Sequence, residues 1–311
     1  MSASSSTTSF FSPRRVIIIA QSTITQLVRM KVFYFLLPVA VLFVGIQFFE
    51  APWYNAAEIS QPEQELIMHK NLCLGTMMLF SSLFAIVSTA LLIPRDIEDR
   101  TLYTILCKPV PRLDYLVGKL IGVMAVIAIA MLVMDLILVI TLHFRTESLL
   151  ALLKPLLVDK SWPGHLIDKK LSVVASHGPT MTLQFAVLAY FLKASVVAAI
   201  ALLISTFSTS TLFTIASSAM IWIIGAAQSI ARDGLFDRGG LAEDSGVIGK
   251  VIATLISLVF PDFQLFDSVA NAATRAAAIT QTDLLNLCGL SFFYLAIYVV
   301  LSWFIFSDKE F

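Results

Sequence analysis

Long apolar stretches with few charged residues recur along the chain and set its class. A helix needs about 20 apolar residues to cross the hydrocarbon core of a bilayer. We expect membrane spans at about 32–49, 71–93, 116–142, 183–205, 212–230 and 284–307. The pattern therefore predicts an all-α, polytopic membrane helix bundle with about six transmembrane helices.

Three shorter apolar segments lie outside these spans. Residues 13–31 mix apolar and polar side chains and are basic at both ends, which favours an N-terminal interfacial helix. The alternative is that this segment is a ragged extension of the first span. Residues 149–158 read as a helix on the outer interface. Residues 251–260 predict a short outer helical hairpin before the last span, because backbone polar groups cannot be left bare in lipid.

Composition agrees with a membrane protein. Hydrophobic residues make up 58% of the 311 residues and charged residues only 14%, with a mean hydropathy of +0.87. A soluble domain is about half apolar and a quarter charged. The net charge is zero, so no basic surplus indicates a nucleic-acid partner. Residues 1–13 are rich in Ser and Thr and are expected to be disordered, and residues 14–311 form one transmembrane domain.

Basic residues in the loops predict the orientation. Four precede the first span and five lie between the second and third spans, whereas the loop between the first two spans has only Lys70. The later outer loops carry nine basic residues, so over the whole chain the two sides of the membrane have nearly equal numbers. We therefore base the orientation on the early spans. We expect a multi-pass protein of the cytoplasmic (inner) membrane with both termini in the cytoplasm.

The loop between the second and third spans, residues 94–115, is the most informative segment. Pro94 suits the first position of a helix, acidic residues follow in the first turn, and Pro109 stops the helix after Lys108. Apolar residues recur at helical spacing between them. A short amphipathic helix here could dock into a groove on a soluble partner or rest on the lipid headgroups. The residues alone leave both uses open.

The same loop resembles that of a known family. The runs are Arg95-Asp96-Ile97-Glu98, Thr101-Leu102, Lys108-Pro109-Val110-Pro111-Arg112, Tyr115 and Gly118-Lys119. They are similar to the loop between spans two and three of type-2 ATP-binding-cassette (ABC) exporter permeases. Three positions depart from that pattern: Asp96 replaces Glu, Arg100 replaces Gly, and Pro111 replaces Ser or Thr.

The resemblance implies the permease, or transmembrane, subunit of an ABC transporter. Its partners would be a cytoplasmic ABC ATPase subunit, a second permease chain (homodimer or heterodimer) and membrane lipids. The chain has no G-x-x-x-x-G-K-[ST] phosphate loop, so ATP and Mg are expected on the partner subunit, with no cofactor and no enzyme activity in this chain. The residues implied to couple to the ATPase are Arg95, Asp96, Glu98, Asp99, Thr101, Leu102, Ile105, Lys108, Pro109, Arg112, Tyr115, Gly118 and Lys119.

Asp135 and Lys193 are the only charged residues deep inside the predicted spans. Such residues are costly in a membrane and are usually paired or functional. We expect an ion pair between them, joining spans three and four. Lining a substrate path, or reaching to the interface, are the alternatives. The four histidines match no metal-ligand spacing.

Two rival functions remain beside the exporter permease. One is a non-transporting scaffold that anchors a soluble partner, and the other is an intramembrane lipid-modifying enzyme. The enzyme would need acidic or His side chains clustered at one membrane depth, and the sequence offers no such cluster. The residues do not indicate the transported substrate.

Overall fold

The computed structural model describes residues 12–46, 62–98, 111–159, 163–208, 210–236, 261–275, 277 and 279–308. In these residues the fold is helical throughout, without strands, so the predicted all-α polytopic bundle is confirmed. The helices are α1 (Pro13–Val28), α2 (Lys31–Ile46), α3 (Pro62–Glu98), α5 (Arg112–Asp159), α6 (Gly164–Ser176), α7 (Met181–Phe207), α8 (Thr211–Phe236), α10 (Gln264–Thr274) and α11 (Gln281–Asp308).

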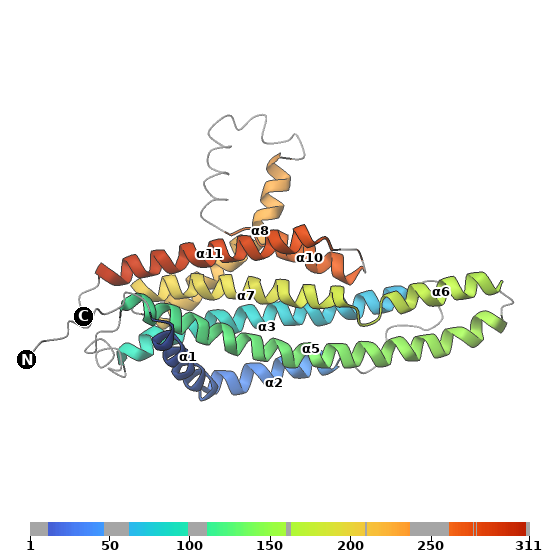
Figure 1. The fold of residues 1–311 in the computed structure, drawn as a ribbon, viewed down its shortest axis with the longest axis horizontal. Helices are drawn as coiled ribbons and strands as arrows, with labels where there is room; N and C mark the ends of the chain where they lie inside the picture. Colours follow the sequence, from blue (N-terminus) through green and yellow to red (C-terminus); the bar gives the residue numbers. More distant parts are fainter. Residues whose placement is uncertain are drawn as a thin grey trace, which may run out of the picture.

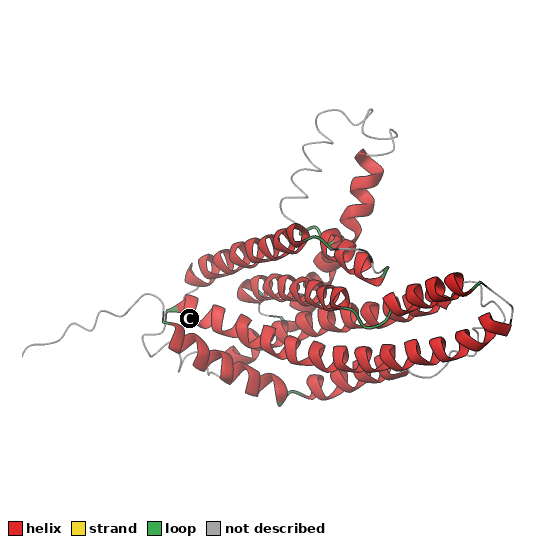
Figure 2. Ribbon diagram, turned by 45° about the vertical axis from the view of Figure 1, so that its right-hand side comes forward, coloured by secondary structure: helices red, strands yellow, loops and turns green. Residues whose placement is uncertain are grey.

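The bundle is elongated, with its long helices lying side by side along one axis (Figure 1). α3 and α7 run in the same direction, and α5 runs against them. The end where α3 stops and α5 begins, here called the loop end, also holds the start of α1 and the end of α11. The turned view in Figure 2 shows the same arrangement, with the last part of α8 pointing away from the bundle.

Four stretches of the described chain are long and apolar enough to cross a membrane. They are Glu63–Pro94, Arg112–Pro155, Gly164–Phe207 and Gln281–Ser307. A fifth arises if the bent pair α1 and α2 counts as one span, and α8 contributes a shorter apolar stretch, Thr211–Ala227. Five of the six segments predicted from the sequence lie within α3, α5, α7, α8 and α11, and the first, 32–49, begins on α2 and runs past its last described residue, Ile46.

α1 is a separate helix, sharply bent away from α2. It meets α2 at an angle of 74°, across a break at Arg29 and Met30. Pro13 occupies the start of α1, where its missing N–H costs nothing, so the predicted disordered segment 1–13 overlaps this helix by one residue. Residues 1–11 of that segment lie outside the described residues.

α3 corrects one prediction about the loop. Pro94 was expected to begin a new helix, but α3 runs through Pro94 and ends at Glu98. A proline inside a helix removes one backbone hydrogen bond. Here the helix continues because Asp96, in its last turn, is held by side chains of neighbouring helices.

α5 corrects a second prediction. The segment 149–158, expected as a separate interfacial helix, is the last part of the 48-residue α5. At about 1.5 Å per residue α5 is about 72 Å long, far more than the ~30 Å hydrocarbon core. α6 lies against this part of α5 (Figure 1), and Leu153 and Leu157 are buried on α5 as Ile167 and Val174 are on α6. Packing against α6 therefore accompanies the burial of Leu153 and Leu157, whereas Leu152 and Val158 of the same segment stay exposed.

α7 is the central helix. Most of its residues from Lys193 to Thr206 are fully buried, and small alanines allow close packing there. It packs against α3, α5, α8, α10 and α11. α11 packs on α7 and α5 but leaves most of its surface open, including Phe292 and Phe304. The predicted hairpin at 251–260 lies outside the described residues, and α10 follows it directly.

Candidate functional site

The structure describes only the two ends of the predicted coupling loop. Residues 99–110 lie outside the described part of the chain. They include six of the predicted site residues: Asp99, Thr101, Leu102, Ile105, Lys108 and Pro109. For Arg95 and Glu98 only the helical backbone is described. The remaining predicted residues are Asp96 on α3 and Arg112, Tyr115, Gly118 and Lys119 on α5. All five lie at the loop end and contact neighbouring helices.

Asp96 is the centre of a buried polar cluster. Its Oδ2 lies 2.7 Å from the Lys119 ammonium and accepts a 2.6 Å hydrogen bond from the Tyr115 hydroxyl. Its Oδ1 accepts a 3.2 Å bond from Gln26 Nε2. Lys119 Nζ also donates to Gln26 Oε1 at 3.0 Å, which closes a ring of contacts. The cluster thus ties α1, α3 and α5 together.

Burial makes this cluster energetically sensitive. The side chains of Lys119 and Asp96 are 5% and 6% exposed. Taking two charges out of water is costly, and the attraction compensates only when extra hydrogen bonds satisfy the remaining polar atoms. Tyr115 and Gln26 supply those bonds. The cluster therefore favours one relative placement of the three helices over others that would leave a charge unpaired.

The end of α11 is attached to the start of α5. Arg112 Nη1 donates to the backbone carbonyl of Phe306 at 2.6 Å and to that of Ser307. These carbonyls belong to the last turn of α11, where no intrahelical N–H is left to pair with them. The Tyr115 ring stacks on Phe306, with centroids 6.0 Å apart and an interplanar angle of 13°. Arg112 and Tyr115 of α5 were both predicted site residues, and both contact the end of α11.

α1 crosses α5 at very short range. Arg15 Nε lies 2.9 Å from Asp114 Oδ2, and Asp114 is fully buried. A Cβ on Gly118 would lie 2.8 Å from Ile19 Cβ, and one on Gly122 would lie 2.6 Å from Thr23 Cβ. Side chains other than hydrogen would push the two helices apart at both points. Glycines four residues apart let membrane helices approach closely.

Sequence reasoning missed part of this site. Gln26, Asp114, Gly122 and Phe306 were not singled out, although each contacts or lies beside a predicted residue. The Gly118-xxx-Gly122 spacing was a readable signal of a helix crossing. Nothing in the sequence indicated that Gln26 and Phe306 would lie at the loop end, because both come from segments distant along the chain.

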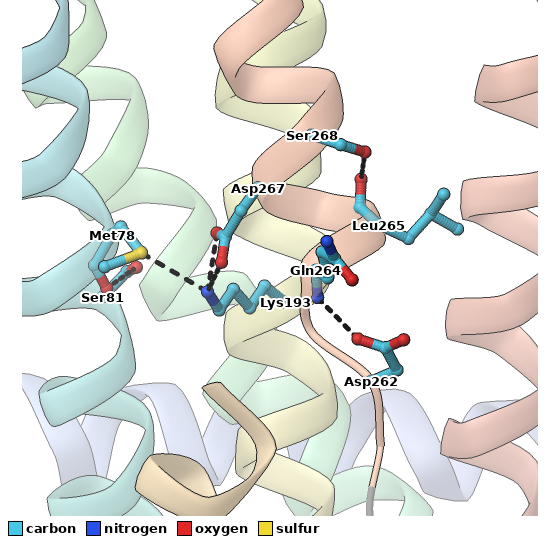
Figure 3. Close-up of polar contacts among 8 residues, drawn as sticks. All are labelled: Met78, Ser81, Lys193, Asp262, Gln264, Leu265, Asp267 and Ser268. Atoms are coloured by element: carbon cyan, nitrogen blue, oxygen red, sulfur yellow. Dashed lines mark hydrogen bonds and ion pairs between the residues drawn. The ribbon is translucent and has the colours of Figure 1, made fainter. Parts of the chain in front are cut away.

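The predicted pair of Asp135 with Lys193 is wrong. The Lys193 ammonium lies 2.7 Å from Oδ1 of Asp267 on α10 (Figure 3). Asp135 instead accepts a 3.2 Å hydrogen bond from Gln184 of α7. Gln184 and Lys193 are nine positions apart on α7, or about 13 Å at ~1.5 Å per residue. Asp135 therefore contacts α7 at a different level along the helix from Lys193.

A small apolar pocket lies between α2, α3 and α5. Its lining includes Phe33, Phe80 and Met131, with the Ser81 hydroxyl as a rare polar group. That hydroxyl donates to the Met78 carbonyl of its own helix. Among the described residues, no group of three or more His, Cys, Asp or Glu side chains is placed to hold a metal ion.

Comparison with known proteins agrees with this architecture. The sequence pattern of the family described as ABC-2 family transporter protein matches residues 17–231, more than half of the chain. The match runs from α1 through most of α8 and includes the whole of the buried cluster except its contacts with α11. No curated protein matches the chain significantly. The chain belongs to the ABC-2 transporter family, as a membrane permease component of an ABC transporter.

Proposed function

We propose that this chain is the membrane-spanning subunit of an ATP-driven exporter. A separate cytoplasmic ABC ATPase subunit, carrying ATP and Mg, would bind the loop 94–115. Two permease chains, identical or different, would pair around the substrate path in the cytoplasmic membrane, with both termini in the cytoplasm. This chain itself would hydrolyse nothing.

One observation carries the proposal: both ends of the loop are anchored to the bundle by charged side chains, the buried Asp96 and the half-buried Arg112. Asp96, at the end of α3, pairs with Lys119 of α5 at 2.7 Å. Arg112, at the start of α5, holds the last carbonyls of α11. A displacement of the loop would therefore move α3, α5 and α11 together, and α1 with them through Gln26. A partner that pushes on the loop could move several spans at once.

The loop also suits its partner chemically. Asp99 and Glu98 at one end and Lys108 at the other match the dipole of a short helix. Thr101, Leu102 and Ile105 would form an apolar face between the two charged ends, of the kind that docks in a groove. Such a face supports a contact with a soluble protein partner.

A pull-down in mild detergent tests the proposal. The tagged chain would be purified beside the variant Glu98→Lys/Leu102→Asp, and copurified proteins would be identified by mass spectrometry. The matched control is Lys169→Glu/Leu166→Asp, which makes the same kinds of change on exposed positions of α6, far from the loop end. The expected result is an ATPase subunit with the wild type and the control, lost with the loop variant.

Other outcomes would redirect the assignment. If a folded wild type brings down a soluble protein without nucleotide-binding motifs, and the loop variant loses it, the scaffold function replaces the exporter. If the loop variant retains the ATPase subunit as well as the wild type does, the loop is not the coupling site.

A further inference from the structure

The Lys193–Asp267 pair stands apart from the loop end. Lys193 lies near the midpoint of α7, and Asp267 lies in the first turn of α10. Lys193 Nζ is 2.7 Å from Asp267 Oδ1 and 2.9 Å from Oδ2. Figure 3 shows the ammonium between the carboxylate and Met78 of α3, with Nζ 3.4 Å from the Met78 sulfur.

The lysine is enclosed, whereas its partner is not. The Lys193 side chain is 1% exposed and that of Asp267 is 34% exposed. The ammonium also lies 5.4 Å from the centre of the Phe263 ring, on the segment that leads into α10. Two of the three groups that stabilise this charge, the carboxylate and the aromatic ring, therefore belong to α10 and the residues just before it. Without α10 and the residues before it, the Met78 sulfur would be the one group of these three left beside the buried Lys193 ammonium.

Apolar contacts seat the same helix. α10 buries Phe266, Val269, Ala270 and Ala273 along one face, and Phe263 before it is fully buried. This face packs mainly on α7, with smaller contacts to α3, α8 and α11.

α8 leaves no spare room at the start of α10. A Cβ on Gly225 would lie 2.7 Å from the Phe263 ring and 2.9 Å from the Pro261 carbonyl oxygen. The segment before α10 is thus pressed against α8 on one side, while α10 lies on α7 on the other. Its position depends on contacts with several helices, of which Lys193–Asp267 is the charged one.

We propose that Lys193 and Asp267 form a latch that holds α10 on α7, so that the two helices move as one unit. Lys193 is a positioning residue in this arrangement, and it acts through Asp267. A charge inside the membrane is tolerated only with a partner, so separating α10 from α7 would cost far more than moving both. The inference concerns the seating of α10 and holds whether or not the loop 94–115 binds an ATPase.

The seating of α10 can be measured by cysteine accessibility in membranes that contain the full chain. The three native cysteines, Cys73, Cys107 and Cys288, would first be replaced. Val269→Cys, on the buried face of α10, then reports on its seating through its reaction with N-ethylmaleimide. Ser268→Cys is the exposed reference on the same helix, and Ala199→Cys is a buried reference within α7.

Three changes to the pair are compared. Lys193→Met and Asp267→Asn each remove one charge, and Lys193→Met/Asp267→Leu replaces both with apolar side chains. We expect Cys at 269 to react roughly tenfold faster in either single variant, because a change of ~1.4 kcal/mol in the opening equilibrium is tenfold. Replacing both partners of a buried pair by apolar groups is often nearly neutral. The double variant should therefore restore protection.

Two results would overturn the latch. One is unchanged protection of position 269 in both single variants, and the other is a double variant as reactive as the singles. Reaction at position 199 as well as 269 would mean that Lys193→Met unfolds the bundle. In that case the test uses Asp267→Asn, which leaves α7 unchanged. If the cysteine at position 269 stays as protected in that variant as in the unchanged pair, the proposal is contradicted.

Discussion

The Lys119 ammonium lies 2.7 Å from the Asp96 carboxylate, so the two helices that flank the loop 94–115 are joined by a buried charge pair. Tyr115 and Gln26 complete the hydrogen bonding of that carboxylate. The loop is therefore connected to the bundle by more than the chain itself. This relationship supports the proposal that the loop couples the spans to a partner.

The first prediction concerns the coupling between Asp96 and Lys119. Asp96→Leu or Lys119→Met should each lower the free energy of unfolding by about 3–5 kcal/mol, because removing one partner of a buried ion pair is strongly destabilising. The double variant should lose clearly less than the sum of the two. Unfolding of the purified chain in one detergent measures all three variants.

Lys169→Met is the matched control, since Lys169 is exposed on α6, and it should change stability by less than about 0.5 kcal/mol. Additive losses for Asp96 and Lys119 would show that the pair does not stabilise the helix contact.

The second prediction concerns the crossing of α1 and α5. Gly122→Ala should destabilise the chain by about 1–3 kcal/mol, because the added Cβ would lie 2.6 Å from Thr23 Cβ and force the helices apart. Gly118→Ala should act in the same direction, with the Cβ 2.8 Å from Ile19 Cβ. Thermal unfolding in detergent is the measurement.

Gly75→Ala and Gly289→Ala are the controls for this change. Each lies within a helix, and no atom of another residue would lie within 4 Å of an added Cβ. Alanine should therefore leave stability unchanged or raise it by up to about 1 kcal/mol. If Gly122→Ala behaves as these controls do, the close approach of α1 and α5 is not required for the fold.

The third prediction concerns the attachment of α11. Arg112→Gln removes the charged donor of the Phe306 and Ser307 carbonyls, whose hydrogen bonds are worth about 1.5–3 kcal/mol when charged. The last turn of α11 should fray, and its amides should exchange with deuterium faster. Hydrogen exchange followed by mass spectrometry over residues 300–308 detects this.

Arg145→Gln serves as the reference for that experiment. Arg145 lies 3.6 Å from Glu65 at the opposite end of the bundle, so its loss should leave exchange in the last turn of α11 unchanged. If the amides in the last turn of α11 exchange as slowly in Arg112→Gln as in Arg145→Gln, Arg112 does not hold α11.

The fourth prediction separates the two charges that the sequence had paired. A cycle of Lys193→Met with Asp267→Leu should give a coupling energy of about 1–3 kcal/mol, whereas Lys193→Met with Asp135→Asn should be additive within ~0.5 kcal/mol. The reason is that Asp135 contacts Gln184, not Lys193. Stability measurements on the single and double variants provide both cycles, and strong coupling of Lys193 to Asp135 would restore the original pairing.

The class of the fold could be predicted from the sequence because it depends on local pattern. Apolar runs of span length predict helices in a membrane whatever they pack against, and the break at 205–211 was visible as a polar run between α7 and α8. The boundaries were less predictable. The apolar segment 149–158 was expected as a separate helix, and only the structure shows that it continues α5 and packs against α6.

The candidate site was predictable in the same limited sense. Asp96, Arg112, Tyr115 and Lys119 were found through a local resemblance in one loop, and the structure brings them to one end of the bundle. Their roles could not be read from the loop, since Asp96 is buried against side chains of α1 and α5. Its further contact Gln26 comes from a helix about 70 positions earlier.

The sequence by itself determined that the chain is an all-α membrane protein and which loop resembles that of a transporter. Both follow from short-range features: the length of apolar runs and the order of charges within about 26 residues. The tertiary structure alone decided which charges meet. Lys193 pairs with Asp267, 74 positions away, because the folding of α10 against α7 sets that distance, and the spacing of residues along the chain does not.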